Sequence, residues 1–154
     1  MTDPATVLVH ATAVAIAGRA VLILGSSGSG KSDLALRLIT TPLLHDGKPL
    51  EVRLVSDDQV IVERQGDRLF ASPPPTIAGR LEVRGIGILP VSFMPRAEVR
   101  LVVVLKPADV IERLPEPGQT HPILGLDVPL VAIDGSKPGA PARVMLAALH
   151  HAKI

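Results

Sequence analysis

Residues 22–32 of the chain read LILGSSGSGKS, and residues 33–39 continue as DLALRLI. The apolar run before Gly25 predicts a β-strand, and the leucines after Ser32 recur at the spacing of an amphipathic helix. A loop rich in glycine and serine joins the two elements. This order is the strand–GxxxxGK[ST]–helix arrangement of a P-loop, a motif that binds phosphate groups.

Each part of this loop has a physical role in holding a nucleotide. Glycines give the backbone the freedom to turn consecutive N–H groups toward one anion. Lys31 adds a positive charge where the β- and γ-phosphates lie, Ser32 can bind magnesium, and the following helix directs its positive end at the phosphates. A flexible turn is the alternative, but it does not explain a lysine and a hydroxyl both at the required positions. The predicted nucleotide-binding residues are Gly25, Ser26, Ser27, Gly28, Ser29, Gly30, Lys31 and Ser32.

The composition favours one compact domain with an aliphatic core. The chain has 154 residues, is 47% hydrophobic and contains no Trp, Tyr or Cys, so that Phe70 and Phe93 are its only large aromatic side chains. A net charge of +1 and the lack of aromatic stacking platforms argue against a nucleic-acid partner. The absence of cysteine excludes disulfides and thiolate metal sites.

Nothing in the sequence predicts a membrane protein. No apolar run reaches the ~18 residues of a transmembrane helix, because His10 and Arg19 interrupt the longest candidate. Residues 1–4, MTDP, lack the basic region of a signal peptide. We therefore expect a soluble, cytoplasmic protein.

Hydrophobic periodicity predicts many strands. They are expected at residues 7–9, 13–17, 20–24, 52–55, 59–63, 68–71, 99–105 and 128–133. The most apolar of them, VRLVVVL at 99–105, is expected at the centre of the sheet. Turns are expected at Gly18-Arg19 and at Asp46-Gly47.

Helices are few. The helix after the P-loop should end before Pro42, and a short helix over 108–114 would stop at Pro115. A C-terminal helix is expected over 142–152, and its candidate buried positions are Val144, Leu146 and Leu149. A doubly wound sheet would need more helices than these. We therefore predict an α/β fold in which the P-loop joins a mixed, largely antiparallel sheet.

A P-loop enzyme also needs a carboxylate near the metal or the attacking group. Asp57 and Asp58 follow the 52–55 strand, where such a carboxylate usually lies. Adjacent strand residues point to opposite faces, so only one of the two is expected to face the phosphates directly. An Asp-Asp turn that merely ends the strand is the alternative.

Residues 9–12 (VHAT), 25–32, 55–58 (VSDD) and 81–88 (LEVRGIGI) together resemble the catalytic domain of the HPr kinase/phosphorylase family, which phosphorylates a serine of the carrier protein HPr. The resemblance implies the HPr kinase/PEP carboxykinase-like fold, ATP and Mg²⁺ as cofactors, an HPr-like phosphocarrier as partner, and a homohexamer. It runs over nearly the whole chain and is similar to the truncated alphaproteobacterial form. We therefore expect residues 1–154 to be a single P-loop kinase catalytic domain without an N-terminal regulatory domain.

The resemblance also implies roles for individual residues. Asp58 would take the proton from the substrate serine, and His10 would lie beside Asp58 and bias its charge and orientation. Lys31 would stabilise charge on the transferred phosphoryl group, while Ser32 and Glu82 would hold magnesium. The alternatives are an exposed turn residue for His10 and a cross-strand salt bridge for Glu82.

Two further cations are implied as catalytic. Arg113 aligns loosely with a family active-site arginine, although a surface position on a helix would explain it equally well. Lys137 would hold phosphate in the dephosphorylation reaction, against the alternative of a solvated loop lysine. The family carries two arginines around a Pro-Gly pair there, whereas this chain has Lys137 and Ala140. That departure argues against phosphorylase activity more than against kinase activity, and the segment 42–51 is also longer than is usual in the family.

The sequence thus predicts an ATP- and Mg-dependent protein serine kinase that acts on an HPr-like phosphocarrier, with phosphorolysis as a possible second reaction. Two alternatives stay open. One is a small-molecule or carboxykinase-like P-loop enzyme. A small-molecule kinase should carry a lid with several arginines. The other is a nucleotide-sensing regulatory module without turnover, against which the joint presence of Lys31, Ser32, Asp58 and Glu82 argues.

Overall fold

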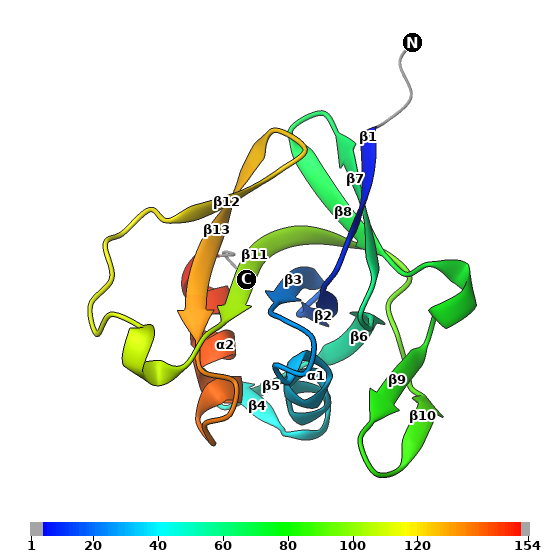
Figure 1. The fold of residues 1–154 in the computed structure, drawn as a ribbon, viewed down its shortest axis with the longest axis horizontal. Helices are drawn as coiled ribbons and strands as arrows, with labels where there is room; N and C mark the ends of the chain where they lie inside the picture. The colour runs from blue at the N-terminus through cyan, green and yellow to red at the C-terminus, as the bar shows by residue number, and fades with distance from the viewer. Residues whose placement is uncertain (1–4, 152–154) are drawn as a thin grey trace.

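The structure, a computed structural model, describes residues 5–151 and has two α-helices beside a large curled sheet (Figure 1), which confirms the predicted α/β class. The large sheet contains β1 (Ala5–Val9), β2 (Thr12–Ile16), β3 (Arg19–Leu24), β6 (Val52–Ser56), β7 (Val60–Gln65), β8 (Arg68–Ser72), β11 (Ala97–Leu105), β12 (Thr120–Ile123) and β13 (Leu126–Ile133). The other elements are the hairpin strands β4 (Leu43–His45), β5 (Lys48–Leu50), β9 (Arg80–Val83) and β10 (Gly87–Pro90), the helices α1 (Lys31–Thr40) and α2 (Ala140–His151), and the 3₁₀ helices η1 (Pro75–Ile77) and η2 (Ala108–Val110).

β11 is the central strand, as its apolar sequence predicts. The sheet runs in the order β1-β7-β8-β11-β3-β2-β6, and β13, which also pairs with β12, adds to the end of β11. β11 is parallel to β3 and β13, whereas the other pairs of this sheet are antiparallel. The carboxyl ends of β3, β11 and β13 therefore meet at one edge, and the loops that follow them lie together there.

An aliphatic core lies on each face of the sheet. Both helices pack on one face, where Leu34 of α1 and Val144 of α2 share a core with Ile23. Leu22 belongs to the core on the other face, over which β1, β7 and β8 fold (Figure 1). Alternate side chains of β3 thus pack into the two cores, because successive residues of a strand point to opposite faces of the sheet. Burial on both sides keeps the strand that leads into the P-loop rigid.

Two small hairpins extend from this body. β4 and β5 pair around Asp46-Gly47, which confirms the predicted turn, and the positive φ angles of 51° and 75° there are those of a type I′ turn. β9 and β10 form the second hairpin, and Leu81 and Val83 of β9 join the core beneath α1. The tight turn before β3 lies at Ala17-Gly18, one residue earlier than predicted.

The helix predicted over 108–114 is wrong. Only η2 forms there, with hydrogen bonds from Val110 N to Pro107 O and from Ile111 N to Ala108 O. The segment offers no apolar face to the core, because Val110 and Leu114 are 62% and 88% exposed. β12, which pairs with β13, was not predicted either.

α2 begins at Ala140, two residues before the predicted start, and the predicted last residue, Ala152, lies outside the described residues, as do residues 1–4. The prediction that Val144 is buried is confirmed, but that for Leu146 is wrong, because Leu146 is 58% exposed. Ala140, Val144 and Ala148, spaced by four, form the buried face instead. Neither helix within residues 5–151 is long and apolar enough to cross a membrane.

Candidate active site

The P-loop lies between β3 and α1, at the edge where the parallel strands end (Figure 1). Gly30 precedes α1 with φ 96°, and no side chain caps the helix, so the N–H groups of the first turn stay available. Space at Gly25 is limited, since a Cβ there would meet the Ser29 hydroxyl and lie 3.2 Å from Ser29 Cβ. The loop therefore presents an open helix N-terminus, which favours an anion.

Two side chains within the loop suit a phosphate ligand. Ser29 Oγ is buried and has no hydrogen-bond partner in the described chain. Lys31 is 6% exposed, and its Nζ donates to Gly25 O at 2.8 Å and to Ser26 O at 3.1 Å. An ammonium group has three donors, so one is left for a ligand. An unpaired buried hydroxyl and a free lysine donor fit the phosphate chain of a nucleotide.

Of the two consecutive aspartates, Asp57 is the one that contacts the P-loop. Its Oδ1 accepts hydrogen bonds from Ser32 Oγ at 2.6 Å and Thr12 Oγ1 at 3.0 Å. Its Oδ2 accepts one from the backbone N–H of Glu82 at 3.0 Å. Three donors from three separate segments therefore hold this carboxylate, which is only 8% exposed, in one orientation beside Ser32.

Asp58 is turned toward His10, and its Oδ1 lies 3.6 Å from His10 Nδ1. Both side chains are more than half exposed, at 64% and 53%. The φ angle of Asp58 is 67°, in the left-handed region that aspartate tolerates better than most residues. The buried Thr12 links the two aspartates, because its Oγ1 accepts the Asp58 N–H at 3.2 Å and donates to Asp57.

Ser32 and Asp57 bring side-chain oxygens together, and oxygen is the ligand that Mg²⁺ prefers. Glu82 stands on the exposed face of β9, and its own N–H binds Asp57. Within residues 5–151, no three or more His, Cys, Asp or Glu residues gather into a metal site. Magnesium that arrives with a nucleotide needs only one or two carboxylates, since water and phosphate supply its other ligands. The donor set therefore fits magnesium.

Lys137 lies in the loop after β13, which borders the P-loop. Leu105 lies close to both loops, because a Cβ on Gly25 would lie 3.4 Å from Leu105 Cβ and one on Gly135 would lie 3.1 Å from Leu105 Cδ2. Arg37 of α1 donates to the carbonyls of Gly135 and Lys137, the latter at 3.2 Å. The side chain of Lys137 is exposed.

Asp134 holds the same loop in place. Its Oδ1 accepts bonds from Ser136 Oγ at 2.6 Å and Ser136 N at 3.0 Å, and its Oδ2 accepts the Ala108 N–H at 2.9 Å. These bonds, those of Ser136 first, and the charge of Lys137 lower the pKa of Asp134. Asp134 is thus ionised at neutral pH and ties the loop after β13 to the loop after β11.

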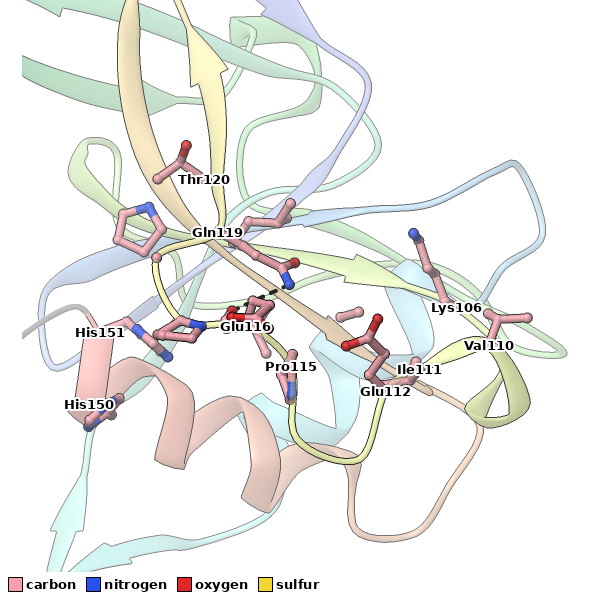
Figure 2. A pocket seen from close by; sticks show the side chains of 16 residues that line it. Lys106, Val110, Ile111, Glu112, Pro115, Glu116, Gln119, Thr120, His150 and His151 are labelled. Carbon is pink, nitrogen blue, oxygen red and sulfur yellow. Dashed lines mark hydrogen bonds between the residues drawn. The ribbon is translucent and has the colours of Figure 1, made fainter.

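Arg113 lies outside any helix or strand. It is exposed in residues 111–119, a segment that borders a pocket of about 520 Å³ beside β13 (Figure 2). Figure 2 shows Lys106 on one side of that pocket and His150 and His151, from the end of α2, on the other. No P-loop residue lines it. A catalytic role for Arg113 stays a prediction.

Asp57, Thr12 and Arg37 shape the site, yet no specific role could be derived for them from the sequence. Asp57 stands in the Asp pair and Thr12 in the 9–12 stretch, but their contact depends on the pairing of β2 with β6. From the sequence alone, Arg37 would be a solvent-facing helix residue that pairs with Asp33 four positions earlier, and that pair does form. Its bond to Lys137 spans 100 residues, a separation that no local pattern reveals.

The curled mixed sheet and the Gly25–Ser32 loop together define a P-loop α/β protein with few helices. The chain belongs to the family of the HPr serine kinase C-terminal domain, because the family model matches residues 4–153.

Named relatives agree with this family. The HPr kinase/phosphorylase of Mycoplasmopsis pulmonis is 36% identical over 107 residues, which cover 65% of this chain and 32% of that protein. The one from Brevibacillus brevis is 35% identical over 139 residues, covering 83% and 42%. The chain thus spans less than half the length of these relatives. The solved structure of the Hpr(Ser) kinase/phosphatase from Coxiella burnetii aligns with a TM-score of 0.75 and 28% identity, over 94% of this chain and 89% of that one.

Proposed function

We propose that this chain is an ATP- and magnesium-dependent protein serine kinase whose substrate is an HPr-like phosphocarrier protein. One observation carries the proposal: the end of β6 brings Asp57 into contact with Ser32 of the P-loop, and Asp58 follows it beside His10. Membership of the HPr serine kinase family, and the names of the relatives, support this choice of substrate.

Asp58 is the proposed general base. It accepts the proton of the substrate serine as that oxygen bonds to the γ-phosphorus of ATP, while the bond to the β–γ bridging oxygen breaks and ADP leaves. His10, 3.6 Å away, orients the carboxylate. A side chain that is 64% exposed is open to a serine on another protein, whereas Asp57 is buried under its three donors. This difference in exposure supports giving the two aspartates different roles.

The P-loop, residues Gly25–Ser32, and the carboxylates beside it form a nucleotide cradle that stabilises the transferred phosphoryl group. Lys31 directs its ammonium at the phosphate oxygens, where charge spreads in the transition state. Ser32, Asp57 and Glu82 hold magnesium, which when bound neutralises charge on those oxygens. The N–H groups at the start of α1 bind the remaining phosphate oxygens.

Phosphorolysis of the phosphoserine by inorganic phosphate is the proposed second reaction, with Lys137 as the cation that holds the phosphate. Ala140, where the family has its second arginine, is fully buried as the first residue of α2 and offers no charge. We therefore expect phosphorolysis to be weaker than kinase activity. Release of pyrophosphate from serine-phosphorylated HPr, with wild type and Lys137→Met, measures it.

We also propose a cytoplasmic homohexamer, as the family resemblance implies. Exposed apolar side chains such as Ile86 and Ile88, at 71% and 67% exposure, offer surface for contacts between subunits. Sedimentation equilibrium should then give about six times the 16.2 kDa of the chain. A monomer at all protein concentrations would contradict this assembly.

The direct experiment incubates the purified chain with ATP, magnesium and the cognate HPr, and locates phosphate by mass spectrometry. Phosphoserine on HPr is the expected result. Lys31→Met is the matched negative variant, because it removes the cradle charge and keeps a side chain of similar length. If the wild type binds nucleotide but leaves HPr unphosphorylated, the kinase proposal fails.

A further inference from the structure

Four arginines gather at the amino ends of β3 and β11, the edge of the sheet opposite the P-loop. The strand register places Phe70 of β8, Glu98 of β11 and Arg19 of β3 in one row across neighbouring strands. Residues directly opposite each other on paired strands share a face of the sheet. Arg68, two residues before Phe70, joins that face by the alternation of the strand.

The other two arginines come from β11 and the residue before it. Arg96 lies two residues before Glu98, just ahead of the strand. Arg100 stands at the register shift between Val99 and Leu101, and such bulges re-aim a side chain. A surface pocket of about 280 Å³ lies between these side chains. Its charged and aromatic lining consists of Arg19, Arg68, Phe70, Arg96, Glu98 and Arg100.

The pocket carries a strong positive charge. Glu98 is the one carboxylate among its lining residues, against four guanidinium groups. Glu98 Oε1 accepts bonds from Arg68 Nε at 3.1 Å and Nη2 at 2.7 Å, and these bonds hold the pKa of Glu98 below its usual range. The guanidinium carbon of Arg96 stacks 3.8 Å from the centre of the Phe70 ring. Even with Glu98 ionised, the lining has three positive charges in excess.

Two buried guanidinium nitrogens of this pocket lack a hydrogen-bond acceptor within residues 5–151: Arg19 Nε and Arg100 Nε. Arg100 Nε lies 3.0 Å from Glu98 Oε2, but the alignment is not that of a hydrogen bond. A buried charged donor without an acceptor is unfavourable, and an anion in the pocket would supply acceptors.

We propose that this arginine pocket is a second anion site, which binds a small multivalent anion such as a phosphate ester or a polycarboxylate. Guanidinium groups pair with the oxygens of both through charge-assisted hydrogen bonds. The site is distinct from the nucleotide cradle, because β3 separates Arg19 from Leu24 by about 17 Å at the usual rise of a strand.

Nuclear magnetic resonance of the ¹⁵N-labelled full chain tests the site. Inorganic phosphate and citrate are titrated separately, with sodium chloride at matched ionic strength as the control. The Nε–Hε signals of Arg19 and Arg100 should shift and saturate with phosphate and with citrate, but not with chloride. The amide signals of residues 28–32 report any binding at the P-loop in the same titration, and the tighter of the two anions identifies the ligand class.

Arg96→Met removes one exposed charge and keeps the apolar stem on Phe70. It should weaken anion binding about tenfold or more, as the loss of a charge-assisted bond does. Arg53→Met is the matched control, since Arg53 is an exposed strand arginine that pairs with Glu51 outside this pocket, and its binding should equal that of the wild type.

Three results would overturn the proposal. The arginine signals could stay unmoved by both anions, or chloride could shift them equally, which would show general screening. Shifts that follow protein concentration rather than anion concentration would assign the pocket to contacts between copies of the chain.

Discussion

At the scale of single residues, two adjacent aspartates take different environments because the backbone turns between them. β6 ends at Ser56, and Asp58 then adopts a φ of 67°. Asp57 is held under the P-loop serine by three donors, while Asp58 emerges beside His10. A non-glycine residue in the left-handed region stores about 1–3 kcal/mol of strain and often marks a functional position.

Replacing Asp58 by Asn should remove catalysis while leaving the fold intact. Asparagine tolerates the left-handed conformation but cannot accept the serine proton, so kcat should fall about 10²–10⁴-fold with nucleotide affinity retained. Phosphorylation kinetics and nucleotide titration measure the two effects. Asp67→Asn, in the exposed β7–β8 turn, is the matched control, and unchanged kcat in Asp58→Asn would remove Asp58 from the mechanism.

Replacing Thr12 by Val should destabilise the protein. The change leaves the buried Asp57 without one donor and the Asp58 N–H without its acceptor, which costs about 1–3 kcal/mol. Urea unfolding measures the free energy. Thr12→Ser restores the hydroxyl and should recover most of the loss; if Thr12→Val unfolds at the wild-type urea concentration, Thr12 does not hold the aspartates in place.

At the scale of elements, three parallel strands that end at one edge bring the P-loop beside the loop that carries Lys137. Leu105 at the end of β11 lies close to both loops. Arg37 of α1 donates hydrogen bonds to the loop that carries Lys137. Asp134 connects that loop to the start of η2. The side chains of Leu105, Arg37 and Asp134 thus hold the two loops in place.

The contribution of Asp134 to stability should depend on pH. Its pKa is lower in the folded chain than the ~3.9 of an unfolded aspartate, so its stabilising effect is present above that value and is lost as pH falls through the folded pKa. Wild type should therefore melt at a higher temperature than Asp134→Asn at pH 7, and the difference between the two melting temperatures should narrow as the pH falls below about 3.9. Scanning calorimetry between pH 7 and pH 3 tests this; a constant gap would contradict it.

At the scale of the whole molecule, the sheet separates two aliphatic cores, and its central strand is buried on both sides. With no Trp or Tyr and only two Phe in the chain, stability depends on close packing of Val, Leu, Ile and Ala. The P-loop and the arginine pocket lie at opposite ends of the same strands, β3 and β11.

Leu101→Ala should cost about 2–5 kcal/mol of unfolding free energy, because Leu101 is fully buried in β11 and the lost side chain leaves a cavity. Leu114→Ala, at 88% exposure, is the control and should stay within about 0.5 kcal/mol of the wild type. Chemical denaturation of both variants measures the difference. Equal stability of the two would show that β11 is not central to the core.

Local sequence was sufficient for the P-loop, for the strand before it and the helix after it, and for the apolar central strand. Each of these depends on contiguous residues whose spacing reflects strand or helix geometry. The helix expected over 108–114 was wrong because local apolar spacing cannot show that the segment has no core to pack against.

Tertiary structure alone decided which aspartate meets Ser32, which loop lies beside the P-loop, and that dispersed arginines form one pocket. These features arise where β2 pairs with β6, β13 with β11, and β8 and β3 with β11. The register between strands far apart in sequence is set by how both faces of the sheet are buried together, and no single segment encodes it.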